Sequence, residues 1–237
     1  MSRKSGRTGA EMPITNGMAL QGGVGTWLSG DTLEPLREIN SQCIELLCAM
    51  AERGDSGLPL LQGLAPMWRM LGRDARQRLA GCPWLLVDAA FGDEARWRQL
   101  TEHRVSDQPR EWRVPCLVGD RGQAFARRVM TYGWHLARSN RSAARVALGM
   151  SAACIDRISS LSLRELDLAS DYYPGWVRPR WEAQVAVWRR LLAAASGADE
   201  SGLQRAGLHG IQLIAAGLLP PLGLAVEARR PPVNSRA

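Results

Sequence analysis

Two closely spaced helix-start signals in the second half of the chain constrain its fold more than any other feature. Gly149 can end a helix at low cost in the left-handed conformation, and Ser151 can cap the next helix by accepting a hydrogen bond from a free N–H group. Ser162 and Glu165 form the capping-box pattern, in which the serine caps the helix and the glutamate accepts from the serine's N–H. The pattern predicts short helices joined by tight turns, the last one beginning at Leu163.

The residue composition favours helices over strands along the whole chain. Leu, Ala and Arg, which are strong helix formers, dominate, whereas the sequence has 2 Phe and 3 Tyr. From Thr32 to Gly54, apolar residues recur at the spacing of one helix face, and a second helical block opens at Gln123. With 237 residues and 46% hydrophobic content, the chain can bury a substantial core. We expect an all-α protein.

Prolines and glycines divide the chain into segments. Pro59, Pro66 and Pro83 interrupt the first helical block, because proline lacks the N–H group that a helix interior needs. The stretch from residue 109 to 122 contains two prolines and two glycines and has no helical period. We expect a disordered tail at 1–31, a first helical half at 32–108, a crossover loop at 109–122, a second helical half at 123–195, and a C-terminal helix with a disordered tail at 196–237.

A faint internal repeat suggests that the two halves are similar. Superposing Asp88 on Asp167 also superposes Trp97 on Trp176, with apolar residues matching between them. A duplication would explain this similarity, and chance is the alternative. On the duplication hypothesis, we expect two similar multi-helix halves packed against each other.

The capped unit in the second half is arranged like a helix-turn-helix. Its last helix would project Arg164 toward a DNA groove. Tight turns with a capping serine also occur in α-helical domains that bind no DNA, and Glu165 and Asp167 offset the charge of Arg164. The local pattern therefore leaves both readings open.

The basic charge of the chain gives it a candidate anionic partner. The formal net charge is +7 and comes almost entirely from Arg, whose planar guanidinium binds phosphate or carboxylate in a bidentate manner. An Arg-for-Lys bias also arises from a GC-rich genome, so the charge permits an acidic partner without requiring one. The candidate nucleic-acid-binding residues cluster within forty residues: Arg141, Arg145, Arg157, Arg164, Arg178 and Arg180.

Tryptophans are the candidate residues of a protein interface. Pro179 favours an extended backbone at Arg178, so that Arg178 and Arg180 would lie on one surface between Trp176 and Trp181. An arginine stacked on a tryptophan is a cation–π pair, and such arginines could also hold a phosphate. The alternative is that the tryptophans pack in the core while the arginines are solvated. The partner-interface candidates are Trp134, Trp176 and Trp181.

The segment LGMSAACIDRISSLSLRELDLAS resembles the core of the FlhD flagellar transcriptional activators and related regulators of mobile elements. The resemblance comprises an L-G-apolar-polar turn at 148–151, an L-S-L step at 161–163 and a following helix that ends near Ala169. It covers roughly residues 124–181. This chain is about twice the length expected of that family, and it lacks the zinc-binding cysteine cluster of the FlhC partner proteins. The resemblance implies a helical transcriptional activator.

The sequence carries no catalytic or metal-binding signature. Its 5 cysteines include no C-x-x-C pair and its 3 histidines lie far apart, so neither a disulfide framework nor a zinc site is indicated. The GGVG run near residue 22 falls in the expected tail rather than between a strand and a helix. We expect a cytoplasmic, non-enzymatic protein with no cofactor and no small-molecule ligand. The sequence also has no secretory signal and no apolar run of about 18 residues, so we expect no membrane contact.

Two functions from different classes follow from these features. The first is a cytoplasmic bacterial transcriptional regulator that acts on DNA as an oligomer or with a partner protein. The second is a non-enzymatic helical adaptor or accessory protein of a secretion or motility apparatus. A basic surface gathered on one face would favour the first, and arginines interspersed with acidic residues would favour the second.

Overall fold

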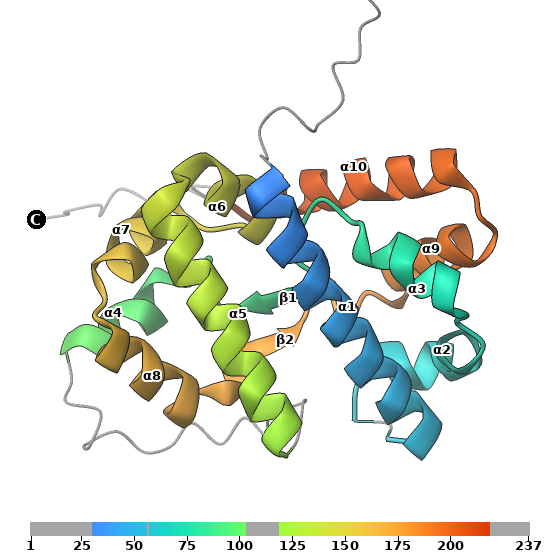
Figure 1. The fold of residues 1–237 in the computed structure, drawn as a ribbon, viewed down its shortest axis with the longest axis horizontal. Coiled ribbons are helices and arrows are strands. Elements are labelled where there is room, and N and C mark those ends of the chain that lie inside the picture. The colour runs from blue at the N-terminus through green and yellow to red at the C-terminus, as the bar shows by residue number, and fades with distance from the viewer. Residues whose placement is uncertain (1–29, 56, 103–118, 219–237) are drawn as a thin grey trace, which may run out of the picture.

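The computed structural model describes residues 30–55, 57–102 and 119–218, and this part of the chain is mostly helical (Figure 1). The prediction of an all-α protein is confirmed, because the described strands are two segments of three residues each. The expected disordered tails lie almost wholly outside the described residues, as does most of the expected crossover loop. The elements are α1 (Gly30–Arg53), α2 (Pro59–Arg69), α3 (Arg73–Ala80), β1 (Val87–Ala89), α4 (Glu94–Glu102), α5 (Asp120–Ser139), α6 (Arg141–Leu148), α7 (Ala152–Ser160), α8 (Leu163–Tyr172), a 3-10 turn (Pro174–Trp176), β2 (Val177–Pro179), α9 (Val185–Ser196) and α10 (Glu200–Leu218).

The predicted helix ends in the capped unit are confirmed. Gly149 ends α6 with a φ of 67°, in the left-handed region. Ser151 caps α7 by accepting from the N–H of Cys154 at 3.1 Å. At the start of α8, Ser162 accepts from the N–H of Glu165 at 3.3 Å, and the Glu165 carboxylate accepts from the N–H of Ser162 at 2.8 Å.

Replacing Ser162 with alanine is expected to lower the free energy of unfolding by about 1 kcal/mol, the usual loss on removal of a helix N-cap. The substitution removes the acceptor for the N–H of Glu165. Urea unfolding monitored by circular dichroism would measure the change. An unchanged unfolding midpoint would contradict the capping role.

Several helix boundaries differ from those expected. α1 begins at Gly30, before the expected start at Thr32, and α5 begins at Asp120, inside the segment expected to be a crossover loop. An acidic residue in the first turn stabilises a helix start through the helix dipole, and Asp120 occupies that place in α5. Pro66 does not end a helix but lies within α2, next to a kink at Leu64. Residues 120–122, the end of the expected crossover loop, thus belong to α5.

The helices pack in two groups, and each group contains one helix from the other half of the chain (Figure 1). In the first group α1 packs against α2 and α3, and in the second α5 packs against α7 and α8. The helix that follows β2, α9, packs against α2 and α3, whereas α4, which follows β1, packs against α7. Contacts thus cross between the expected halves at 32–108 and 123–195 in both directions.

The two strands meet between these groups and are followed by similar connections. β1 and β2 pair antiparallel, with Asp88 opposite Arg178. Ala90 follows β1 with a φ of 56°, and Trp181 follows shortly after β2 with a φ of 49°. In each case a tryptophan of the following helix donates its indole N–H back to this connection. Trp97 bonds to the carbonyl of Ala90 at 2.9 Å, and Trp188 bonds to that of Arg180 at 2.7 Å.

The residue equivalence expected from the sequence repeat is wrong. Asp88 lies in β1 but Asp167 lies within α8, and Trp97 lies in α4 but Trp176 lies in the 3-10 turn before β2. In the structure Trp97 corresponds in role to Trp188, because each donates its indole N–H to a backbone carbonyl in the turn that follows a strand. The corresponding elements begin 90 residues apart, as Val87 of β1 and Val177 of β2 do, so residues 79 apart occupy different structural positions.

A buried asparagine fixes the extended segment between α3 and β1. The side chain of Asn40 is fully buried in α1. Its Nδ2 donates to the carbonyls of Trp84 at 3.0 Å and Ala80 at 3.3 Å, and its Oδ1 accepts from the N–H of Leu86 at 2.8 Å. A buried amide is stable only when its polar atoms are paired in this way. Asn40 therefore holds the segment that carries the chain from α3 into the sheet.

None of the helices in the described ranges combines the length and apolar character needed to cross a membrane.

Candidate protein-binding groove

Helix α10 lies against the rest of the molecule along a narrow strip of small residues. Its buried residues are Gly207, Gly210 and Ile214. Trp84 packs under the two glycines and donates its indole N–H to the carbonyl of Gly207 at 3.1 Å. The glycines let the helix backbone approach the indole closely, so neighbouring apolar side chains stay outside the contact. Leu208 is 49% exposed as a result.

Replacing Gly210 with alanine is expected to lower the free energy of unfolding by about 1–2 kcal/mol, the range for overpacking a core. A Cβ at this position would lie 2.4 Å from the ring of Trp84, which is fully buried. Gly217→Ala is the matched control on the same helix, because no atom lies within 4 Å of its added Cβ. The control should gain up to about 1 kcal/mol from helix propensity. Equal unfolding midpoints for the two variants would contradict the close contact.

A groove runs between α10, α1 and α3. Its volume is about 1130 Å³, and its apolar lining includes Pro83, Leu203, Leu208 and Ile211. Polar side chains surround this apolar lining. The polar lining residues are Glu34, Arg37, Glu38 and Ser41 of α1, Gln77 and Arg78 of α3, and Glu200 and Gln204 of α10.

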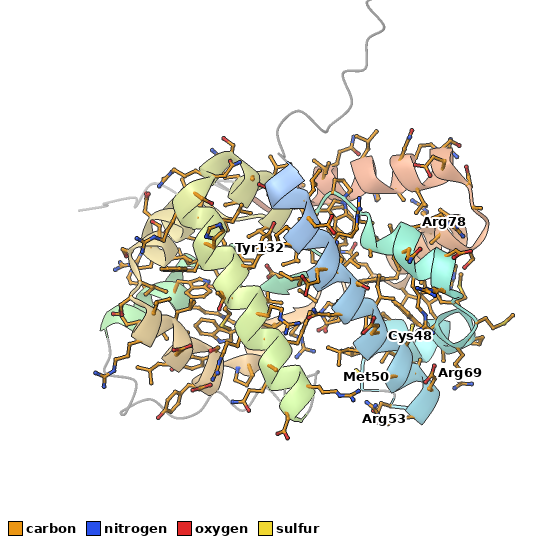
Figure 2. The ribbon with its side chains drawn as sticks, viewed as in Figure 1. Cys48, Met50, Arg53, Arg69, Arg78 and Tyr132 are labelled. Carbon is orange, nitrogen blue, oxygen red and sulfur yellow. The ribbon has the colours of Figure 1, made fainter. Side chains whose placement is uncertain are left out.

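The charged groups of the groove have a slight acidic excess on a chain that is basic overall. Glu34, Glu38 and Glu200 face two arginines. Arg37 pairs with Glu34 at 3.8 Å. Arg78 extends from α3 toward α9 and donates from Nε to the carbonyl of Ala195 at 2.9 Å, in the last turn of that helix (Figure 2). Because carbonyls at a helix C-terminus carry partial negative charge, Arg78 is in part neutralised there.

The chemistry of the groove suits binding. Cys82 lies at its base, and burial raises the pKa of the thiol to about 12, which keeps it protonated at neutral pH. Within the described ranges, no three or more His, Cys, Asp or Glu side chains are grouped so as to hold a metal ion. An apolar lining bordered by charged groups is the arrangement of a protein-binding groove.

Arg180 was expected to bind nucleic acid; its burial argues against this role, which stays a prediction. Its side chain is only 10% exposed and donates from Nε to the carbonyl of Leu85 at 2.8 Å, while Nη2 donates to the carbonyl of Leu148. Asp88 lies 3.6 Å from the guanidinium. Burial lowers the pKa of Arg180, and Asp88 opposes that shift. Buried carbonyls thus take the donors that a phosphate would need.

Of the other five expected nucleic-acid-binding residues, two form ion pairs with carboxylates and three lie on different helices. Arg178 pairs with Glu182 at 2.8 Å, and Arg141 pairs with Asp156 at 2.6 Å. The remaining three lie on different helices: Arg145 on α6 and Arg164 on α8 are exposed, and Arg157 on α7 is half-buried.

The exposed side of α8 carries carboxylates as well as Arg164. Asp171 pairs with Arg127 of α5 at 2.6 Å, and Asp167 lies 4.0 Å from the same arginine. α8 therefore presents no uniformly basic face, and its role as a DNA-reading helix stays a prediction.

The expected tryptophan interface is wrong for Trp176 and stays a prediction for the other two. Trp176 is 6% exposed and packs edge-on against Trp97, with ring centroids 5.3 Å apart. Trp181 is half-buried and packs edge-on against Trp84. Trp134 is also half-buried and donates its indole N–H to a backbone carbonyl at 2.8 Å. The core-packing alternative thus holds for Trp176.

Two features of the structure, a cation–π pair on α5 and the groove, have only weak signals in the sequence. The cation–π pair occurs at Trp134 and Arg138, one helical turn apart, with 4.7 Å from the guanidinium carbon to the ring centroid. The groove went unpredicted, although the i, i+3 spacing of Gly207 and Gly210 beside Leu208 is a signal of close helix packing. Which indole would lie beneath those glycines depends on contacts between residues far apart in the chain.

Comparisons of the chain with protein-family models, with curated proteins and with solved structures gave no match. The resemblance to the FlhD family therefore rests on the turn and cap residues alone.

Proposed function

We propose that this protein is a non-enzymatic bacterial regulator of transcription that acts through a protein partner, and that the partner binds in the groove between α1, α3 and α10. In this proposal the partner supplies the contacts to DNA, and the protein works in the cytoplasm. The observation that carries the proposal is the groove itself, which combines an apolar lining with a border of polar and charged side chains.

The surroundings of the arginines support an indirect route to DNA. Arg141, Arg178 and Arg180 each lie beside a carboxylate of the same chain. Phosphate contacts supply much of the affinity of DNA-binding proteins, and arginines held in this way are poor phosphate ligands. The transcriptional role itself comes from the FlhD-like turn and cap residues.

A helical adaptor of a secretion or motility apparatus is the second candidate. The observation that favours it is the frequency of arginine–carboxylate pairs on different elements, such as Arg127 with Asp171 and Arg141 with Asp156. Such mixing of charge suits a surface that meets proteins rather than DNA. The groove would serve an adaptor equally well, so the two candidates differ in whether the complex reaches the chromosome.

Chromatin immunoprecipitation of the tagged full-length protein separates the two candidates. We expect enrichment at discrete chromosomal sites for the wild type and its loss for Leu208→Arg, which places a charge on the lining of the groove. Met70→Arg is the matched control, because Met70 is an exposed apolar residue, at 85%, outside the groove and outside α8. Absence of discrete sites for the wild type would favour the adaptor. Unchanged enrichment for Leu208→Arg would reject the groove as the route to DNA.

A further inference from the structure

We propose that the groove takes a basic amphipathic helix of the partner protein, with apolar residues on one face and lysines or arginines flanking them. This inference rests on the proposed function, because it names the chemistry of the partner for the same groove. Charge complementarity carries it. The lining has three glutamates and two arginines on a chain whose net charge is +7. Arg37 pairs with Glu34 and Arg78 bonds to the end of α9, which leaves the charges of Glu38 and Glu200 available to the partner.

The walls of the groove favour a helix over an extended peptide. An extended peptide gains affinity by adding a strand to a free sheet edge. The groove is walled by the helices α1, α3 and α10 and by the segment 81–83, and none of these is a strand. Backbone groups within helices already bond to one another. Side chains must therefore provide the recognition, and a helix supplies them at i, i+3, i+4 and i+7 along one face.

The apolar lining offers complementary contacts for such a face. Leu208 is about half exposed on α10, and Leu203 and Ile211 are half-buried on the same helix. The volume of about 1130 Å³ exceeds the range for small-molecule pockets, which is roughly 300–1,000 Å³. A row of leucine-sized side chains would fill this space, while its cationic neighbours would lie beside the glutamates.

The test measures binding of a designed probe to the full-length protein by fluorescence anisotropy. The probe is a fluorescein-labelled helical peptide of leucine and lysine, with the leucines on one face; a second peptide has glutamate in place of each lysine. We expect the lysine peptide to bind at least tenfold more tightly than the glutamate peptide. The double variant Glu38→Lys, Glu200→Lys should lose about tenfold in affinity for the lysine peptide, and Leu208→Arg should lose at least as much.

Glu52→Lys and Met70→Arg are the matched controls, because both residues are exposed and lie outside the groove. Each should bind the lysine peptide as the wild type does. Equal binding of the two peptides, or equal losses in the control and groove variants, would overturn the proposal. Circular dichroism of each variant confirms that it is folded.

Two other occupants of the groove are distinguishable outcomes. Replacing Arg229, Arg230 and Arg236 with glutamate in the full chain should leave peptide affinity unchanged. A tenfold gain would indicate that the basic C-terminal segment fills the groove and would overturn the proposal. A concentration-dependent dimer that Leu208→Arg abolishes would assign the groove to a second copy of the chain. That outcome would also overturn the proposal.

The peptide test and the chromosomal test fail independently. Selective peptide binding without chromosomal sites would support the basic helix and reject the regulator. Chromosomal sites that need Leu208, without any preference between the peptides, would reject only the basic helix.

Discussion

Asn40→Ala is expected to lower the free energy of unfolding by about 3 kcal/mol or more. The substitution leaves the N–H of Leu86 and the carbonyl of Trp84 buried without their partner, and each unpaired buried group costs about 1–3 kcal/mol. The lost side-chain volume adds a cavity beneath the extended segment. Urea unfolding at constant pH, followed by circular dichroism, would measure the change.

Gln42→Ala is the control for Asn40→Ala on the same helix. Gln42 donates to the exposed Glu38 at 3.0 Å rather than to buried backbone, so its loss should change stability by no more than about 0.5 kcal/mol. If both variants unfold at the same urea concentration as the wild type, Asn40 does not hold the segment as described.

Arg180→Ala is expected to lower the free energy of unfolding by about 2 kcal/mol or more, because each buried polar group left unpaired costs about 1–3 kcal/mol. The carbonyls of Leu85 and Leu148 would lose their donor, and Asp88 would lose its nearby cation. Arg180→Lys should recover only part of the loss, because an ammonium group cannot reproduce the planar geometry of the guanidinium. Thermal and urea unfolding would measure both variants.

Arg164→Ala is the comparison for Arg180→Ala, because Arg164 is exposed on α8. It should change stability by less than about 0.5 kcal/mol. A wild-type unfolding curve for Arg180→Ala, together with weakened binding to duplex DNA, would restore the nucleic-acid role that the burial of Arg180 argues against.

Local signals in the sequence predicted local structure well. The αL end at Gly149, the cap at Ser151 and the capping box at Ser162 all occur as expected, because each depends on residues within four positions of one another. The helical class also followed from composition. Such signals, however, do not specify which helices meet.

The misassigned residues depend on contacts across the chain. The sequence left open whether Trp176 is exposed. Trp176 and Arg180 flank β2, which pairs with a strand about ninety residues earlier. This pairing places Trp176 in the core and Arg180 against backbone carbonyls. The groove likewise forms where α10 meets α1 and α3. Neither pairing leaves a periodic pattern in the sequence, so local reasoning could not find them.

The packing of α9 against α2 and α3 affects the order in which the protein can fold during synthesis. Trp68 of α2 packs against Trp188 of α9, with ring centroids 5.6 Å apart, and α9 also covers α3. At about 5–20 residues per second, the ribosome delivers α9 on the order of 5–25 s after α2. Until then the first helices lack the surface that buries their indole, and the growing chain exposes apolar side chains. The helices synthesised first are therefore among the last to complete their core. We expect a nascent chain of this protein to need a chaperone more than a chain whose halves fold one after the other.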